Sequence, residues 1–433
     1  MMKKVSIFWF RRDLRVDDNV GLYNALKAEH PVLPIFIFDS EILDRLPKED
    51  ARVTFIHNEL EKINKKLKSQ NTGIDLFFGK PLAVFQKLSN RYDIQQVYAN
   101  HDYEPYAVKR DSIIKEFFNL KSIQFQTFKD QVIFEKNEIV KADGSPYVVY
   151  TPFSKKWLAG FTKKHIESYT SENLLDQLYK REKIETLQLK DIGFTASKII
   201  VKGFHIDSFL IDEYEATRNF PALDQTSRLG PHLRFGTVSV RKMVAKAAKQ
   251  YNDTFLKELI WREFFMQILW HFPQTAHKCF KQKYERVAWR NNEEEFAKWC
   301  HGNTGYPLVD AGMRQLNETG FMHNRVRMLV GSFLCKHLLI DWRWGEAYFA
   351  EKLHDYEMAS NIGNWQWVAG CGVDAAPYFR IFNPTTQIQK FDKNLAYIKK
   401  WVPEFQELTY PAPIVDHKFA RERCLKTYKS ALA

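Results

Sequence analysis

The feature that most constrains this chain is an alternation, in its first third, of short apolar runs with longer stretches compatible with helices. The stretches between the runs include Ala51–Ser69 and Pro105–Leu120. The apolar runs are Val5–Phe10, Val32–Phe38, Ile74–Phe78, Gln96–Ala99 and Ile123–Phe128. Such alternation is typical of right-handed βαβ units, so we predict an N-terminal α/β domain built on a parallel sheet.

The turn after the first run differs from a dinucleotide-binding fingerprint. A G-x-G-x-x-G sequence would stand there in a Rossmann domain, and the residues present are Arg11-Arg12-Asp13-Leu14-Arg15. We therefore expect no dinucleotide at the usual Rossmann position.

The second half of this chain of 433 residues has a helical pattern. Between Arg241 and Gly370 the only prolines are Pro273 and Pro307, and apolar residues recur at helical spacing, as in Glu258–His271 and Asn324–Leu339. We predict an α/β domain over 1–130, an inter-domain connector over 131–202 and an all-α domain over 203–433.

Charge and cysteine usage limit the classes of partner. The formal net charge of +12 favours a polyanion such as nucleic acid over an incidental basic surface. The five cysteines contain no C-x-x-C pair, so we expect neither a disulfide framework nor a metal site. The run Val5–Phe10 is too short for a secretion signal, and no apolar run reaches membrane-spanning length, so we expect a cytoplasmic protein without membrane contact.

Two segments combine residue types that suit a bound base or phosphate. Glu258, Trp261 and Arg262 lie on neighbouring positions of one helix face, which suits a base in a pocket or, alternatively, an ion pair beside a core tryptophan. The segment Thr226–Gly230 joins hydroxyls, a cation and a glycine, which can bond a pyrophosphate or simply cap the next helix.

Two further segments are unusual in the helical half. His323–Met328 gathers polar and basic groups into little more than one helical turn, which suits phosphates or a solvated cap. Asp355–Trp367 mixes carboxylates, amides, glycine and two tryptophans, a mixture that a core does not need. Its tryptophans, with Trp342 and Trp289 upstream, suit a stacking platform, a redox chain or core packing.

Ordered blocks along essentially the whole chain carry a family resemblance. They are Trp9–Arg15, Thr226–Leu229, Glu258–Phe264, Gly305–Pro307, Met322–Met328, Trp365–Trp367 and Asp374–Pro384. Together they closely resemble the photolyase/cryptochrome family. The resemblance implies a helical domain that holds FAD, a basic face that receives DNA, and a light-driven lyase in which photoexcited reduced FAD passes an electron to a flipped-out pyrimidine dimer.

Within the family the chain looks most like bacterial class I enzymes that repair cyclobutane pyrimidine dimers. Glu258 matches the carboxylate that bonds the dimer by donating or sharing a proton, and Trp261 matches the ring that stacks on it. Met328 stands where enzymes for the (6-4) photoproduct carry a histidine. A (6-4) photolyase and a cryptochrome-type blue-light sensor are the alternatives.

The resemblance also implies cofactor contacts. Asn361 matches the residue that faces flavin N5, where a neutral amide favours reduced flavin. Glu357 replaces the more usual aspartate. The other implied FAD contacts are Tyr214, Thr226, Ser227, Arg228, Leu229, Arg262, Arg327, Asp355 and Glu357, with Arg327 expected to pair with Asp355.

Lesion, DNA and electron-transfer positions follow in the same way. Asn324, Met328, Glu258 and Asn361 are the implied catalytic set. Trp365, Trp342 and Trp289 match the proximal, middle and distal members of a photoreduction chain. The implied DNA contacts are Trp261, Arg325, Trp367, Gln387 and Lys390.

A second chromophore is expected to differ from folate. Folate-antenna relatives carry an Asn-Glu pair where this chain has Tyr106 and Ala107. A deazaflavin, a flavin or no antenna is therefore favoured. The expected partner is UV-damaged DNA, and the expected state is a monomer with no obligate protein partner.

Overall fold

The computed structural model describes residues 2–433, which form two compact units. Within the described residues, the α/β unit comprises 2–138, 160–203 and 229–249, and the helical unit comprises 139–159, 204–228 and 250–433. The predicted connector, 131–202, contributes to both units. The contacts divide the chain differently from the ranges 1–130, 131–202 and 203–433, and the division into two domains and a connector at those boundaries stays a prediction.

The α/β unit contains the predicted parallel sheet, in the strand order β3-β2-β1-β4-β5. Its strands are β1 (Lys4–Phe10), β2 (Val32–Asp39), β3 (Asp75–Gly79), β4 (Asp93–Asn100) and β5 (Gln124–Phe128). Each lies within a few residues of a predicted run. The sheet is in parallel register throughout, for example with Trp9 opposite Ile35.

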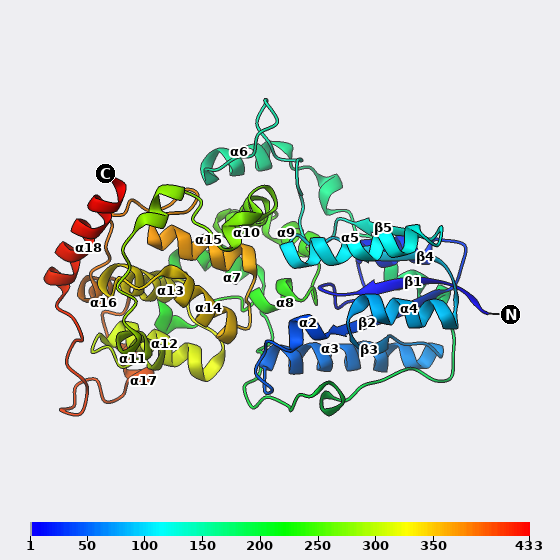
Figure 1. Ribbon diagram of the computed structural model, residues 1–433, viewed down its shortest axis with the longest axis horizontal. Coiled ribbons are helices and arrows are strands. Elements are labelled where there is room, and N and C mark those ends of the chain that lie inside the picture. Colours follow the sequence, from blue (N-terminus) through cyan, green and yellow to red (C-terminus); the bar gives the residue numbers. More distant parts are fainter. Residues whose placement is uncertain (1) are drawn as a thin grey trace. The chain divides into compact units, whose positions relative to one another are not determined.

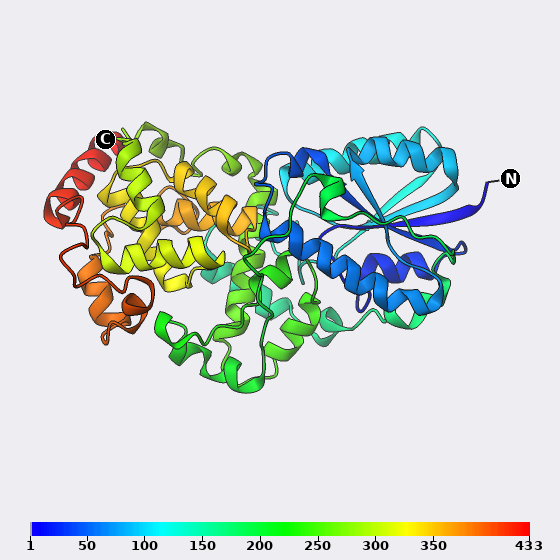
Figure 2. The same ribbon diagram turned by 90° about the horizontal axis from the view of Figure 1, so that it is seen from below.

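Helices cover both faces of this sheet, as Figure 2 shows. Phe8 and Phe10 of β1 pack with α1 and α3 on one face, and Ile7 and Trp9 pack with α4 and α5 on the other. Because both faces of the central strands β1 and β2 are buried, these two strands are nearly continuous apolar runs rather than alternating ones. The helices of the unit are α1 (Val20–Leu26), α2 (Ser40–Leu43), α3 (Ala51–Leu67), α4 (Pro81–Arg91), α5 (Pro105–Asn119), α8 (Gly230–Arg234) and α9 (Val240–Ala247).

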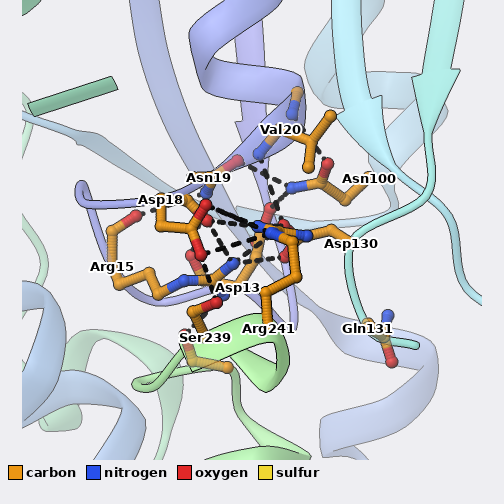
Figure 3. Close-up of polar contacts among 12 residues, drawn as sticks. Asp13, Arg15, Asp18, Asn19, Val20, Asn100, Asp130, Gln131, Ser239 and Arg241 are labelled. Carbon is orange, nitrogen blue, oxygen red and sulfur yellow. Dashed lines mark hydrogen bonds and ion pairs between the residues drawn. The ribbon is translucent and has the colours of Figure 1, made fainter. Parts of the chain in front are cut away.

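A buried network of charges ties α9 to the N-terminal part of the α/β unit (Figure 3). The Arg15 guanidinium donates to both oxygens of Asp130 at 2.8 and 2.7 Å, and Arg241 donates to Asp130 at 2.9 Å and to the Asp18 carboxylate at 3.1 Å. The Ser239 hydroxyl also donates to Asp18. These groups are almost fully buried, so each needs the others to offset its lost hydration.

Burial and pairing shift the acids of this network in opposite directions. Burial, reinforced by the charge of Asp130, raises the pKa of Asp13, which accepts from Asn100 Nδ2 at 2.6 Å. Burial opposes ionisation of Asp130 as well, but Arg15 and Arg241 hold its pKa below the usual value. The network therefore pairs two arginines with Asp18 and Asp130, while the neighbouring Asp13, held by Asn100, accepts a proton more readily than an ordinary aspartate.

One large apolar cluster joins residues from Cys279 to Ala431 of the helical unit, whose helices are drawn in Figure 1. Two helical glycines allow close packing: a Cβ on Gly345 of α14 would lie 2.1 Å from the Trp365 ring, and one on Gly363 of α15 would lie 2.2 Å from Phe265 of α10. The helices are α6 (Tyr150–Gly160), α7 (Ser208–Thr217), α10 (Thr254–His271), α11 (Glu293–His301), α12 (Pro307–Thr319), α13 (Asn324–Ser332), α14 (Trp342–Lys352), α15 (Met358–Ala369), α16 (Pro384–Phe391), α17 (Ala396–Trp401) and α18 (His417–Leu432).

The α/β plus all-α fold class predicted from the sequence is confirmed. One helix ends earlier than its pattern indicates. The apolar spacing over 324–339 gives α13 up to Ser332, followed by a π-helical turn at Phe333–His337. The Lys336 side chain in that turn is buried and donates to the Ala369 carbonyl at 2.9 Å, an interaction that the local pattern does not reveal.

Candidate active site

A cluster of arginines surrounds the start of α13 in the helical unit. His323 is the N-cap, and its Nδ1 accepts the Arg325 amide at 3.2 Å. Burial, together with the positive charges of Arg327, Arg325 and Arg228, lowers the pKa of His323 to about 4. The histidine is therefore neutral at pH 7, and the positive charge of the cluster comes from the arginines.

The loop before α8 supplies the residues predicted to bind phosphate. Arg228 has a positive φ of 56°, pairs with Asp224 and places its guanidinium 3.5 Å from the Phe321 ring centroid. The Ser227 carbonyl accepts the His205 amide at 2.9 Å. The Thr226 hydroxyl is buried without a hydrogen-bond partner anywhere in residues 2–433. Leu229 is buried within the α/β unit, so its predicted FAD contact stays a prediction.

An orphaned hydroxyl beside several arginines fits an anionic ligand. Buried polar groups normally have a partner, and an unpaired one marks a place where a ligand or water completes the bonding. Arginines and hydroxyls are the groups that hold phosphate oxygens. The donor set around Thr226 and Arg228 therefore fits the pyrophosphate of a dinucleotide cofactor such as FAD.

Three polar pairs involve the remaining predicted cofactor contacts. Arg262 of α10 pairs with Glu357 at 2.9 Å, so glutamate at this position reaches its arginine. Arg327 pairs with Asp355 at 2.9 Å, as predicted. Asn361 of α15 donates from Nδ2 to Oε1 of Glu346 at 2.9 Å and to the Glu346 carbonyl at 3.1 Å. Burial raises the pKa of Glu346.

The Glu346 contact fixes how the Asn361 amide is oriented. Because the amide nitrogen donates to Glu346, the amide oxygen is the atom left to accept a bond from elsewhere. An acceptor at this position suits a neighbouring N–H donor.

The predicted lesion-binding residues share the exposed side of α10. Glu258 pairs with Arg218 at 2.5 Å, and both side chains are partly exposed. Trp261, one turn further along, is half-buried. Tyr214 lies near the same pair: burial, reinforced by the charge of Glu258, raises its pKa to about 12. The Tyr214 ring packs edge-on against Phe255 at 5.2 Å.

The predicted DNA contacts other than Trp261 lie on three helices. Arg325 of α13 donates to the Asn219 side chain, lies 3.6 Å from the sulfur of Met328, and stacks at 4.4 Å on Phe391 of α16. This contact brings Arg325 to the helix that carries Gln387 and the exposed Lys390. Asn324 is exposed at the first position of α13, and Trp367 of α15 is half-buried.

The three tryptophans of the predicted chain have different surroundings. Trp365 is buried and packs edge-on against Phe349 at 5.0 Å. Trp342 is buried with its indole N–H unpartnered among the described residues, and Trp289 is half-buried and packs against Tyr428 at 5.9 Å. Their electron-transfer role stays a prediction.

Sequence reasoning missed Arg218, Asn219, Glu346 and Tyr150, although each contacts a predicted site residue. Tyr150 stacks flat on Trp261, with ring centroids 3.6 Å apart and planes 6° apart. Arg218 and Glu258 are separated by α8, α9 and their connections, so no local spacing joins them. The signal available was composition alone: each is a polar, charged or aromatic residue.

In the α/β unit, the residues that replace the folate pair lie near the carboxyl ends of β1 and β2. Tyr106 of α5 donates from its hydroxyl to Asp39, the last residue of β2, at 2.6 Å. Ala107 is buried. The Trp9 ring lies 4.9 Å from the Arg11 guanidinium and 4.7 Å from that of Arg110, and its buried indole N–H is another donor without a partner in residues 2–433.

Comparison with known proteins assigns the chain to a family. Residues 6–171 match the model described as DNA photolyase, and residues 255–409 match the FAD-binding domain of DNA photolyase. The chain belongs to the DNA photolyase family. The predicted family, enzyme class and FAD cofactor are confirmed at this level.

Relatives match this photolyase over its whole length. A deoxyribodipyrimidine photo-lyase of Agrobacterium fabrum is 36% identical over 98% of this chain and 97% of its own. A solved bacterial class III photolyase from Agrobacterium tumefaciens is 33% identical with a TM-score of 0.89, covering 100% of this chain and 98% of its own. An archaeal photolyase from Sulfolobus tokodaii, solved with two FAD molecules, is 34% identical with a TM-score of 0.82, covering 99% and 100%.

Three predictions concern the enzyme class within the family, the cellular location and the oligomeric state. One similar structure is a class III enzyme, so the predicted likeness to class I stays a prediction. None of the helices described between residues 2 and 433 is long and apolar enough to cross a membrane. The cytoplasmic location and the monomeric state stay predictions.

Proposed function

We propose that this photolyase splits cyclobutane pyrimidine dimers in UV-damaged DNA. The observation that carries the proposal is the exposed side of α10, where the Glu258–Arg218 pair and Trp261 lie one turn apart. A carboxylate and a guanidinium can bond the polar edge of a pyrimidine, and an indole can stack on its face. The groups that can bond the edge of a flipped-out pyrimidine are therefore adjacent to the ring that can stack on its face.

Arg218 refines the role predicted for Glu258. A carboxylate held by a guanidinium presents its oxygens as acceptors, which fit the ring N–H of a pyrimidine. The guanidinium in turn offers N–H groups to a carbonyl of the dimer. We propose that the pair works as a unit, with Glu258 accepting and Arg218 donating.

FAD would be held by the arginine cluster and its neighbours. Thr226, Ser227 and Arg228 would bind the pyrophosphate, Tyr214 and the Arg262–Glu357 and Arg327–Asp355 pairs would line the remainder, and the Asn361 amide oxygen would accept from the flavin ring. When bound and reduced, FAD supplies the photoexcited electron that opens the cyclobutane ring. Glu346 orients Asn361 for this contact.

DNA would be held by groups around α13 and α16. Arg325, Gln387 and Lys390 would contact phosphates, and Asn324, Met328 and Trp367 would contact the lesion or its strand. Stacking on Trp261 offsets part of the few kcal/mol needed to extrude the dinucleotide from the duplex, at about 1–3 kcal/mol per base.

The tryptophans would carry an electron inward to restore the reduced state. A crossed experiment tests this separately from repair. Trp365→Phe should abolish most photoreduction of the bound flavin while leaving dimer splitting intact in chemically reduced protein. Glu258→Ala should photoreduce normally and repair less. Loss of repair in pre-reduced Trp365→Phe that still binds FAD would contradict the assignment.

The decisive assay is light-dependent loss of cyclobutane dimers from an irradiated oligonucleotide. Repair of dimers, with no repair of (6-4) photoproducts, is the expected result. Repair of (6-4) photoproducts instead would favour the alternative lesion, and absence of both activities in FAD-loaded, reduced protein would favour a light sensor of the cryptochrome type.

We also propose a deazaflavin or flavin, rather than folate, as second chromophore of the α/β unit. The support is the Tyr106–Asp39 bond and the unpartnered Trp9 indole near the sheet's carboxyl edge, where open parallel sheets bind ligands. The relative from Sulfolobus tokodaii holds two FAD molecules. Mass spectrometry of chromophores released from protein made in a folate-rich host should find no methenyltetrahydrofolate; its presence would contradict the proposal.

A further inference from the structure

A tyrosine outside every predicted site contacts the proposed stacking residue. We propose that Tyr150 is a positioning residue for lesion binding: its ring backs the Trp261 indole and fixes it as a one-sided stacking platform. This inference rests on the proposed function, in which Trp261 stacks on the dimer.

The two rings are parallel and in face-to-face contact. Their centroids are 3.6 Å apart and their planes differ by 6°. One face of the indole is therefore covered by protein. Trp261 as a whole remains half-buried, so part of its surface is still accessible.

Tyr150 is held at both ends. Its hydroxyl donates to the Lys257 carbonyl at 2.8 Å, one helical turn before Trp261 in α10. Its backbone N–H donates to Oδ2 of Asp374 at 3.2 Å, in the segment that follows α15. The ring is thereby fixed to the same helix that carries Trp261 and Glu258.

The helix that begins at Tyr150 is itself anchored by buried contacts. In α6, Phe153 packs against Phe264 at 5.2 Å between ring centroids, and Trp157 donates from Nε1 to Glu263 at 2.6 Å. Both Trp157 and Glu263 are almost fully buried. The position of Tyr150 is thus set by core packing rather than by a free loop.

A supported indole has an advantage over an unsupported one. A side chain that must be ordered on binding lowers the affinity, whereas one already held in its bound orientation does not. Tyr150 orders Trp261 during folding, before DNA arrives. It also restricts a base to the uncovered side of the indole.

Two substitutions separate the ring from the hydroxyl. Tyr150→Leu keeps apolar volume and removes the aromatic plane, and we expect it to weaken binding of a dimer-containing oligonucleotide by about 3- to 10-fold, with little change for undamaged DNA. Tyr150→Phe keeps the plane and should bind both DNAs within about twofold of wild type. Equal losses in the two variants would overturn the proposal.

A matched control and a double variant guard against a merely structural explanation. Phe153→Leu loosens the same helix without touching Trp261, so it should lower the urea midpoint while preserving the preference for damaged DNA. In a Trp261→Ala background, Tyr150→Leu should cause no further loss of that preference. An undiminished further loss would show that Tyr150 acts independently of Trp261 and would overturn the inference.

The outcomes also distinguish this inference from the proposed function. If Trp261→Ala itself leaves the preference for damaged DNA unchanged, the stacking role in the proposed function fails. If Trp261→Ala lowers the preference and Tyr150→Leu does not, only the role of Tyr150 fails. Tighter binding of dimer-containing DNA by Tyr150→Leu would show that Tyr150 covers the face the lesion needs, and would overturn the proposal.

Discussion

The buried charges of the α/β unit and the arginine cluster of the helical unit differ in which kind of group is in excess. Carboxyl groups outnumber arginines in the first, and arginines outnumber carboxyl groups in the second. In the former, Arg15 and Arg241 pair with Asp18 and Asp130, and a third carboxyl group, that of Asp13, accepts from Asn100 instead of an arginine side chain. In the latter, the three arginines 228, 325 and 327 have two acidic partners, Asp224 and Asp355.

The two clusters also differ in what compensates the extra acidic or basic group. The surplus acid in the α/β network is buried, and its raised pKa lets it take up a proton, so the network needs nothing from outside. The surplus cation in the helical unit is only partly buried and cannot lose its proton. An anion would complete it, which supports a structural role for the first cluster and the proposed binding role for the second.

The largest effect is expected when the α/β network loses one of its arginines. Arg241→Met leaves Asp18 and Asp130 buried with fewer partners, and should lower the free energy of unfolding by about 3–5 kcal/mol. Urea titration followed by circular dichroism measures this.

Lys242→Met is the matched control for that variant. Lys242 is the next residue of α9, and its pair with Asp17 is exposed, with side-chain exposures of 44% and 43%. Its loss should cost less than about 1 kcal/mol. Similar losses in the two variants would show that the network does not hold α9.

The second expected effect concerns pH and the helical unit. The pKa of His323 is about 4 in the folded protein and near 6.5 when unfolded, so between these values the unfolded chain binds more protons. Stability should therefore fall as pH falls from 6.5 to 4, by about 3 kcal/mol at most from this residue.

His323→Asn keeps an acceptor for the N-cap and removes the titration, so it should flatten that part of the pH dependence. His337 and His417, whose pKa values are also lowered by burial, will leave a residual slope in both proteins. The exposed His205 provides the control, because His205→Asn should leave the wild-type slope unchanged. An unaltered slope in His323→Asn would contradict the buried, neutral state of this histidine.

The same contrast explains what could be predicted from the sequence. The central strands were the easiest to predict because both of their faces are buried and each is a local apolar run, as in Val32–Asp39. Residues such as Glu258 and Asn361 were predictable only because ordered motifs resemble a family.

Contacts between distant segments were not predictable. Arg241 pairs with Asp18, and Tyr150 stacks on Trp261, although the partners of each pair are far apart in the sequence. No periodicity in the sequence relates them. The charge of +12 indicates an anionic partner but does not tell which arginines are already paired. Whether an arginine is paired depends on the tertiary structure, and this pairing decides whether the arginine has a structural or a binding role.

The difference between the two clusters can also be tested by removing one hydroxyl group from each region. Thr226→Val removes a hydroxyl that has no protein partner, so it should weaken FAD binding by about 1.5–3 kcal/mol, the range for a hydrogen bond to a charged group, while leaving the stability of the apoprotein unchanged or higher. Fluorescence titration of apoprotein with FAD and urea unfolding measure the two quantities.

Ser239→Ala should show the reverse pattern. Its hydroxyl donates to the buried Asp18 carboxylate, so its loss should destabilise the protein by about 1–3 kcal/mol without changing FAD affinity. If Thr226→Val destabilises the apoprotein as much as Ser239→Ala does, the Thr226 hydroxyl has a structural role and the distinction between the two regions fails.

The smallest expected effect is the loss of a single phosphate contact at the edge of the binding region. Lys390 is exposed on α16, beside the Arg325–Phe391 stack, so it adds charge without supporting the fold. Lys390→Gln should weaken binding of damaged and undamaged DNA alike and reduce the slope of log affinity against log salt by about 0.9, the value for one released counterion. Arg325→Gln should lower the slope similarly.

Lys298, which pairs with Glu294 on the exposed surface of α11, is the control, and Lys298→Gln should leave the slope unchanged. An equal change in slope for Lys298→Gln and Lys390→Gln would mean that DNA responds to net charge alone, and that α16 is not part of the binding face.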